Sequence, residues 1–191
     1  MKKDSWKIYL GDIPYNEKEM FWVSFESDPR LSRTKANIYG RCLPCIQNLY
    51  EQLNAGKSSI DMGNAYNCWK ITAVVENIDH CLSLLFEFEK RYAYGHVYGK
   101  IGSGRVNSTT KVVVFHTDDE SERDRLAFAL QRCIELMTLN AKIFISRGCD
   151  TLHKPILGEW QMWQPTTPIC FPEKIPEHIE KIRKIIKTGR M

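Results

Sequence analysis

The stretch from Trp69 to Ser146 constrains the fold more than any other part of this 191-residue chain. Short segments rich in β-branched residues alternate there with longer segments whose apolar residues recur at helical spacing. The order reads strand, helix, strand, loop, strand, helix, strand. A chain with this order is expected to form a sheet covered by helices.

Two predicted helices carry the apolar faces that would cover such a sheet. The first is capped by Asn77 or Asp79, and its apolar stripe is Cys81, Leu84, Leu85, Phe88 and Tyr92. The second begins with the capping box of residues 117–120, and its stripe is Leu126, Leu130, Cys133 and Met137. Because this box gives Asp118 and Asp119 a structural role in the first helical turn, neither carboxylate is assigned to a metal site.

The four strands are predicted at residues 69–75, 95–101, 111–116 and 141–146. This βαββαβ order is typical of a ferredoxin-like core, in which an antiparallel sheet has both helices on one face. The first and third strands are the most apolar, as the two central positions of that sheet require. The predicted class is therefore α+β, and a fold of this kind says little about function.

We expect three parts along the chain: an N-terminal α/β extension at 1–68, the ferredoxin-like core at 69–146, and a C-terminal part at 147–191. The extension has strands at 7–10 and 20–25 and a helix that begins near Pro44 and ends at Gly56. The C-terminal part is expected to be an extended wrapping tail that carries Trp160 and Trp163, followed by a helix over 173–190.

Composition narrows the class of protein. Hydrophobic residues make up 43% of the chain and charged residues 26%, which excludes a disordered or fibrous chain. No apolar run reaches the roughly 18 residues of a membrane span, and the first residues lack the apolar core of a secretory signal. We therefore expect a cytoplasmic protein without membrane contact, in which most of the seven cysteines are reduced.

Strand alternation places several polar residues on one face of the predicted sheet. A hairpin turn near Val106 would set His96 opposite His116 and Tyr98 opposite Val114, with these side chains pointing away from the helices. Lys70, Thr72, Lys100, Lys142 and Phe144 would share this open face. The face is basic and partly aromatic.

Such a face favours binding of RNA or a nucleotide, because lysines neutralise phosphates and rings stack on bases. The predicted ligand-binding residues are Lys100, Arg105, Lys111, Lys142 and Phe144, and the Gly/Ser-rich loop at 102–110 can approach an anion. Two histidines can also act as general base and acid, so His96, Tyr98 and His116 are candidate catalytic residues for metal-independent RNA cleavage. The sequence does not decide whether the protein is an enzyme.

A second interpretation is an interaction or assembly module, in which the sheet face and the Trp160/Trp163 segment bury against a second copy or another protein. Exposed strand faces and tryptophans are common at such interfaces. A simpler alternative is that the N-terminal 68 residues or the Trp-rich tail cover the face, which leaves His96 and His116 as satisfied polar groups at a domain junction.

A third interpretation is dithiol redox chemistry at Cys42-Leu43-Pro44-Cys45. A helix start at this motif would lower the pKa of the first thiol, as in thioredoxin-type oxidoreductases. With Cys149 and Cys170 the pair could also form a zinc site, but those two are isolated and not spaced as a second zinc knuckle. We therefore expect no metal and no cofactor.

Overall fold

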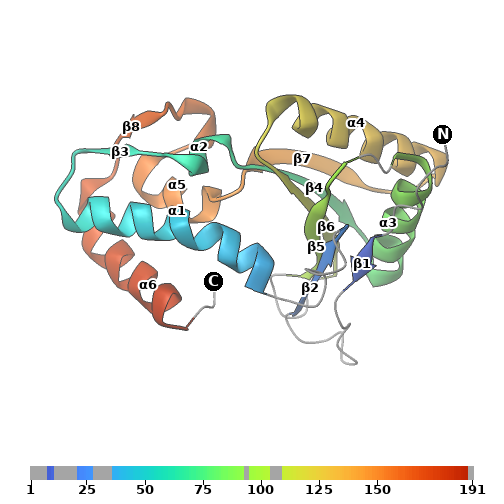
Figure 1. The fold of residues 1–191 in the computed structure, drawn as a ribbon, viewed down its shortest axis with the longest axis horizontal. Coiled ribbons are helices and arrows are strands. Elements are labelled where there is room, and N and C mark those ends of the chain that lie inside the picture. The colour runs from blue at the N-terminus through green and yellow to red at the C-terminus, as the bar shows by residue number, and fades with distance from the viewer. Residues whose placement is uncertain (1–7, 11–20, 28–35, 93–94, 104–108, 189–191) are drawn as a thin grey trace. The chain divides into compact units, whose positions relative to one another are not determined.

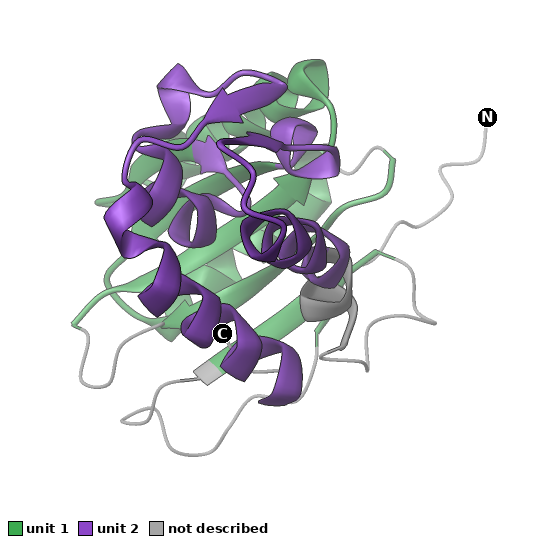
Figure 2. Ribbon diagram, turned by 90° about the vertical axis from the view of Figure 1, so that its left-hand side faces the viewer, with its two compact units in different colours: residues 1–38, 69–145 green, residues 39–68, 146–191 purple. Residues whose placement is uncertain are grey.

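The computed structural model describes residues 8–10, 21–27, 36–92, 95–103 and 109–188 (Figure 1). The chain forms two compact units, which Figure 2 draws in different colours. Unit 1 contains residues 1–38 and 69–145, and unit 2 contains residues 39–68 and 146–191. This differs from the three parts expected from the sequence, because residues 39–68 join the C-terminal residues and not the N-terminal ones.

Unit 1 is built on a six-stranded sheet with the order β1-β2-β5-β6-β4-β7. The neighbouring pairs β1–β2, β2–β5, β5–β6 and β6–β4 are antiparallel. Mixed α and β structure with an open antiparallel sheet confirms the predicted class. The strand bounds are β1 Tyr9–Leu10, β2 Phe21–Glu26, β4 Trp69–Val75, β5 Tyr98–Ser103, β6 Lys111–Thr117 and β7 Lys142–Arg147.

Helices α3 (Ile78–Tyr92) and α4 (Glu120–Leu136) pack on one face of this sheet. The odd-numbered residues of β4 and β6 point toward them, because side chains alternate along a strand. A single apolar core results, which includes Ile71, Val113, Phe115, Leu84, Phe88, Leu126 and Leu130. The apolar stripes of both helices therefore face the core, as predicted from the sequence.

The start of α4 differs from the predicted capping box. The Asp119 carboxylate caps the helix by accepting a hydrogen bond from the Glu122 backbone N–H at 2.8 Å. Thr117 is not the cap because it still belongs to β6, where it pairs with Trp69. Asp119 thus keeps the structural role expected of it, although it stands before the helix and not inside its first turn. In α3 the Asn77 side chain caps as predicted, accepting from the His80 N–H.

Most of α1 (Ala36–Asn54) belongs to unit 2, and this helix starts well before the residue predicted. Pro44 lies inside the helix. A proline in this position removes one backbone hydrogen bond but does not by itself end the helix. The apolar stripe after it is continuous, since Ile46, Leu49 and Leu53 are all buried.

The prediction of an extended tail after Arg147 is wrong for most of that segment. After β7 the chain forms α5 (Asp150–Leu157), and β8 (Thr166–Pro168) then pairs antiparallel with β3 (Ser59–Asp61). The remaining elements of unit 2 are the short helices α2 (Asn64–Asn67), η1 (Trp160–Met162) and η2 (Pro172–Lys174), and the last helix, α6 (Ile175–Thr188). No helix in the described ranges has both the length and the apolar composition of a membrane span.

Candidate functional site

The face of the unit 1 sheet opposite the helices, here called the helix-free face, carries most of the residues predicted from the sequence. Tyr98 on β5 pairs with His116 on β6, and Lys100 pairs with Val114. The predicted register, in which His96 stands opposite His116, is therefore wrong by two residues. An even shift leaves every side chain on its predicted face.

The Tyr98 ring stacks against both histidines. Its centroid lies 5.5 Å from that of His96 and 6.1 Å from that of His116. His96 is also held by an acidic residue of β2, since its Nε2 lies 2.5 Å from Oε1 of Glu26. Each imidazole thus contacts the Tyr98 ring. The two do not face each other, as a general acid and a general base on either side of a phosphodiester would.

Two lysines and an aromatic ring on this face lie close to solvent. The Lys100 ammonium sits 4.0 Å from the centroid of the Trp22 ring, a cation–π contact between β5 and β2. Lys142 and Phe144 on β7 are exposed, and Phe144 retains 54% of its accessible surface. Ile143 between them packs on the helix side, which fixes the direction of its two neighbours.

Other parts of the predicted site are less accessible. Val114 and His116 are only 3% and 7% exposed, so the middle of the helix-free face is covered. Lys111 is buried, and its charge acts on the Cys81 thiol of α3, so Lys111 belongs to the helix side of the sheet. Arg105 lies outside the described residues.

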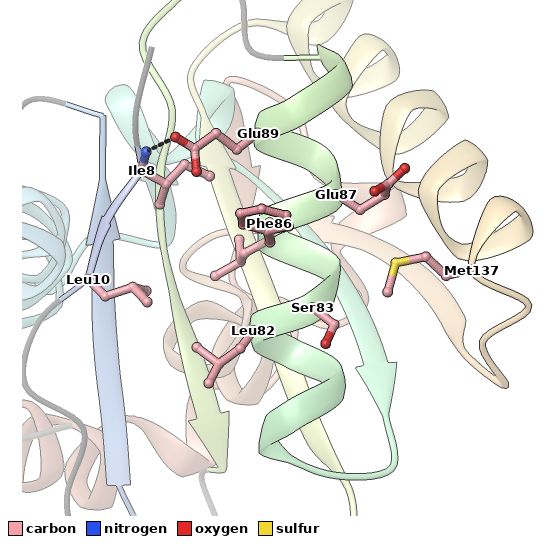
Figure 3. A pocket seen from close by; sticks show the side chains of 9 residues that line it. Ile8, Leu10, Leu82, Ser83, Phe86, Glu87, Glu89 and Met137 are labelled. Atoms are coloured by element: carbon pink, nitrogen blue, oxygen red, sulfur yellow. Dashed lines mark hydrogen bonds between the residues drawn. The ribbon is translucent and has the colours of Figure 1, made fainter. Parts of the chain in front are cut away.

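A pocket of about 540 Å³ opens elsewhere in unit 1, between β1 and α3 (Figure 3). Its walls are mainly apolar and include Leu10, Leu82 and Phe86. Both of its carboxylates have partners: Glu89 accepts a hydrogen bond from the Ile8 N–H, and Glu87 binds Arg91. No residue predicted from the sequence to belong to a site lines it. Its acidic and apolar lining does not suit an anion.

Unit 2 brings together four cysteine thiols from three separate segments, here called the cysteine cluster. Cys42 and Cys45 lie on α1, Cys68 follows α2, and Cys149 precedes α5. Cys42, Cys45 and Cys149 pack in one buried core cluster, and the thiols of Cys42, Cys45 and Cys68 are near enough to Cys149 to act on its pKa. No sequence pattern indicates Cys68, whereas Cys170, a candidate ligand by sequence, is exposed and donates instead to the Leu157 carbonyl at 3.3 Å.

The cluster is tightly packed around Cys68 and Gly148. A β-carbon added to Gly148 would lie 2.3 Å from the Cys68 sulfur, and the Gly148 N–H donates to the Cys68 carbonyl at 2.8 Å. Cys42, Cys45 and Cys149 are buried in the core of unit 2. The two segments that carry Cys68 and Cys149 are therefore fixed against each other.

These thiols are not arranged as a thioredoxin-type redox site. Because α1 begins at Ala36, Cys42 lies inside the helix and not at the N-terminus that would activate it. None of the seven cysteines forms a disulfide. Hydrogen bonds with the thiols of Cys42, Cys45 and Cys68, together with burial, raise the pKa of Cys149 well above its usual value. The cluster thus favours protonated thiols as long as no cation is present.

A histidine one turn after Cys149 does not act as its base. The His153 Nδ1 lies 3.1 Å from the Cys149 backbone carbonyl and so bonds the main chain, not the thiol. Burial lowers the pKa of His153 to about 4. This imidazole is neutral at physiological pH, and its role is to hold the start of α5.

The described residues thus present two groupings, the helix-free face in unit 1 and the cysteine cluster in unit 2. Within the described residues, no group of three or more His, Cys, Asp or Glu side chains is already arranged around a metal position. No known protein family, curated protein or solved structure matches this chain, so both groupings have to be interpreted from their own residues.

Proposed function

We propose that unit 1 binds an anionic ligand, with single-stranded RNA as the first candidate, on the helix-free face. The observation that supports this most is the presence of lysines beside aromatic rings on one face: Lys100 beside Trp22 and Tyr98, and Lys142 beside Phe144. Lysines attract phosphates, and aromatic rings stack on unpaired bases whatever their sequence.

The topology of unit 1 supports the same proposal. The strands β5, β6, β4 and β7 stand in the order second, third, first, fourth along the chain, with α3 and α4 on one face. We propose that this is the ferredoxin-like arrangement. Four-stranded sheets of this kind leave one face without helices, and RNA-binding modules use that face to stack two or three bases.

The Tyr98 and Phe144 rings lie too far apart for one nucleotide to contact both, and the buried Val114 and His116 of β6 lie between them. Tyr98 and Phe144 lie on β5 and β7, which are three strand steps apart in the sheet. At a strand spacing of about 4.8 Å the lateral separation is roughly 14 Å. Two bases of one strand, not a single nucleotide, would be needed to reach both rings.

Cleavage is not part of this proposal. It depended on His96 and His116 standing opposite each other, and the observed pairing sets Tyr98 there instead. The assembly interpretation gains little from the Trp-rich segment, because Trp163 is buried in unit 2 and donates its indole N–H to the Gly158 carbonyl.

The proposal is tested by fluorescence anisotropy of a labelled single-stranded oligouridine at low ionic strength. We expect Lys142→Ala and Lys100→Ala each to weaken binding several-fold and to reduce the slope of log affinity against log salt concentration. Phe144→Ala should weaken binding roughly 5- to 150-fold, because each stacked base contributes about 1–3 kcal/mol. The matched control is Lys154→Ala, which removes an exposed lysine paired with Glu159 in unit 2.

Three results would reject the proposal. The first is an affinity that does not change with salt, and the second is an equal effect of all three lysine variants. The third is no binding by the wild-type protein. Light scattering on the same samples separates the remaining interpretation: a wild-type dimer that Phe144→Ala converts to a monomer, without RNA binding, identifies an assembly surface.

A further inference from the structure

The four uncharged thiols of the cysteine cluster are poorly satisfied as hydrogen-bonding groups. A thiol is a weak hydrogen-bond donor and a weak acceptor, so four of them in contact satisfy each other poorly. None of the four forms a disulfide. Soft cations bind sulfur strongly, and a cation at this position would replace weak S–H contacts by strong metal–sulfur bonds.

We propose that Cys42, Cys45, Cys68 and Cys149 bind one Zn²⁺ ion as a structural four-thiolate site. Cys42, Cys45 and Cys149 pack together in the core of unit 2 and the Cys68 sulfur lies against Gly148, so the site is independent of the function proposed for unit 1. Four cysteine ligands in a tetrahedron are one of the closed structural zinc sites, and the two-residue spacing of Cys42 and Cys45 is that of a zinc knuckle.

Binding changes both the protonation and the side-chain positions of the cluster. Four S–H bonds break and four Zn–S bonds form, four protons and the waters bound to the hydrated ion leave to solvent, and no electron is transferred. As the thiols stand, they do not surround a common centre. Rotation of the cysteine side chains to a zinc–sulfur distance of about 2.3 Å completes the site, and zinc binding and local ordering are commonly coupled in this way.

The surroundings of the cluster partly offset the charge of the product. A zinc ion with four thiolates carries two negative charges. The Arg147 guanidinium is buried and lies 4.3 Å from the centroid of the Tyr66 ring. These two residues precede Cys149 and Cys68 by two positions each, so a fixed positive charge belongs to the segments that supply two of the ligands.

The proposed ion would join three segments that no other cross-link connects. These are α1 with Cys42 and Cys45, the turn after α2 with Cys68, and the start of α5 with Cys149. Segments that are distant in the sequence gain most from such a link, because closing long loops costs the most chain entropy. Zinc is thus expected to stabilise unit 2 and not to perform catalysis.

The first test measures metal in the full-length protein purified under reducing conditions. Elemental analysis should find about one zinc per chain. After removal of zinc, titration with Co²⁺ should give the thiolate-to-metal charge-transfer and visible bands of a tetrahedral four-sulfur site. Cys45→Ser and Cys149→Ser should lower zinc affinity at least about 100-fold, as loss of one of four ligands does.

Two matched controls separate the site from cysteine content alone. Cys170→Ser removes the exposed cysteine outside the cluster, and Cys133→Ala removes a buried cysteine of unit 1. Both should keep one zinc per chain. If ligand variants fail to fold, mass-spectrometric mapping of alkylated cysteines in the wild-type protein decides instead: Zn²⁺ should protect the four cluster cysteines and leave Cys170 reactive.

Three outcomes would overturn the inference. The first is less than about a tenth of a zinc per chain after the metal-free protein is incubated with Zn²⁺ and desalted. The second is equal zinc binding by Cys149→Ser and Cys170→Ser. The third is iron with acid-labile sulfide in place of zinc, which would assign the same four thiols to an iron–sulfur cluster.

Discussion

The ring of Phe25 on β2 lies across Gly99, its partner on β5, so closely that no side chain fits between them. A β-carbon at position 99 would be 2.4 Å from the Phe25 ring and 1.9 Å from the Val114 carbonyl oxygen. Phe25 in turn packs edge-on against Phe115 at a centroid distance of 4.8 Å. The absence of a side chain at Gly99 lets β2 join the sheet with its aromatic residue in the core.

Gly99→Ala is therefore expected to destabilise unit 1. The added methyl group must displace either a backbone carbonyl or a buried ring, and overpacking of this kind costs about 1–3 kcal/mol of the free energy of unfolding. Urea unfolding measures the loss. Gly56→Ala is the control for backbone strain without crowding, since its β-carbon would meet open space and its cost is that of the left-handed backbone, about 1–2 kcal/mol. A Gly99→Ala loss no larger than that of the control contradicts the crowding.

Asp119→Ala should weaken the start of α4. The carboxylate accepts from the Glu122 N–H and the Ser121 hydroxyl, and these bonds hold the pKa of Asp119 below its usual value. Loss of an N-cap of this type lowers the melting temperature by about 2–4 °C at neutral pH. Asp119→Asn keeps the acceptor oxygen and should retain most of the stability.

The effect of Asp119→Ala also depends on pH in a definite direction. Because the folded-state pKa of Asp119 is depressed, its contribution is complete above the ordinary value of 3.8 and is lost as the pH falls through the folded-state value. The difference in melting temperature between wild type and Asp119→Ala should thus narrow in acid. A difference that stays constant from pH 7 to pH 2 assigns the effect to something other than the carboxylate.

Buried and exposed cysteines should differ in their reactivity toward alkylation. Burial raises the pKa of Cys81 to about 12 and that of Cys133 to about 11, so neither forms the reactive thiolate near pH 8. Cys170 is exposed. Alkylation of the native protein followed by peptide mapping should label Cys170 first and should label Cys81 and Cys133 only after denaturation. Early labelling of Cys133 would show that α4 does not protect it.

Local sequence patterns were sufficient to predict most of the helices and strand faces of unit 1. The stripes through Leu84 and Leu130 predicted two helices and their buried faces, and alternation placed Tyr98 and Phe144 on one side of the sheet. The register was missed because it depends on a hairpin whose turn position no local pattern specifies. A strand with buried residues on one face resists a shift by one residue but not by two.

Unit 2 was less predictable because its elements join distant segments. The tail after Arg147 contains Pro155, Pro165 and Pro168, which favour extended structure locally, yet α5 forms and β8 pairs with β3. The short β8 is stabilised by its partner, more than one hundred residues earlier, and its own sequence does not indicate it. Tertiary contacts outweigh weak local preferences in such segments.

The sequence by itself determined which residues face a core, because helical and strand periodicities are local properties of the chain. It also determined that lysines and aromatic rings share one sheet face. Only the tertiary structure decided that Cys68 and Cys149 meet Cys42 and Cys45, since contact between residues so far apart depends on how the segments pack and leaves no periodic trace. The cluster thus depends on tertiary packing, and the two-residue spacing of Cys42 and Cys45 was the one feature of the sequence that indicated it.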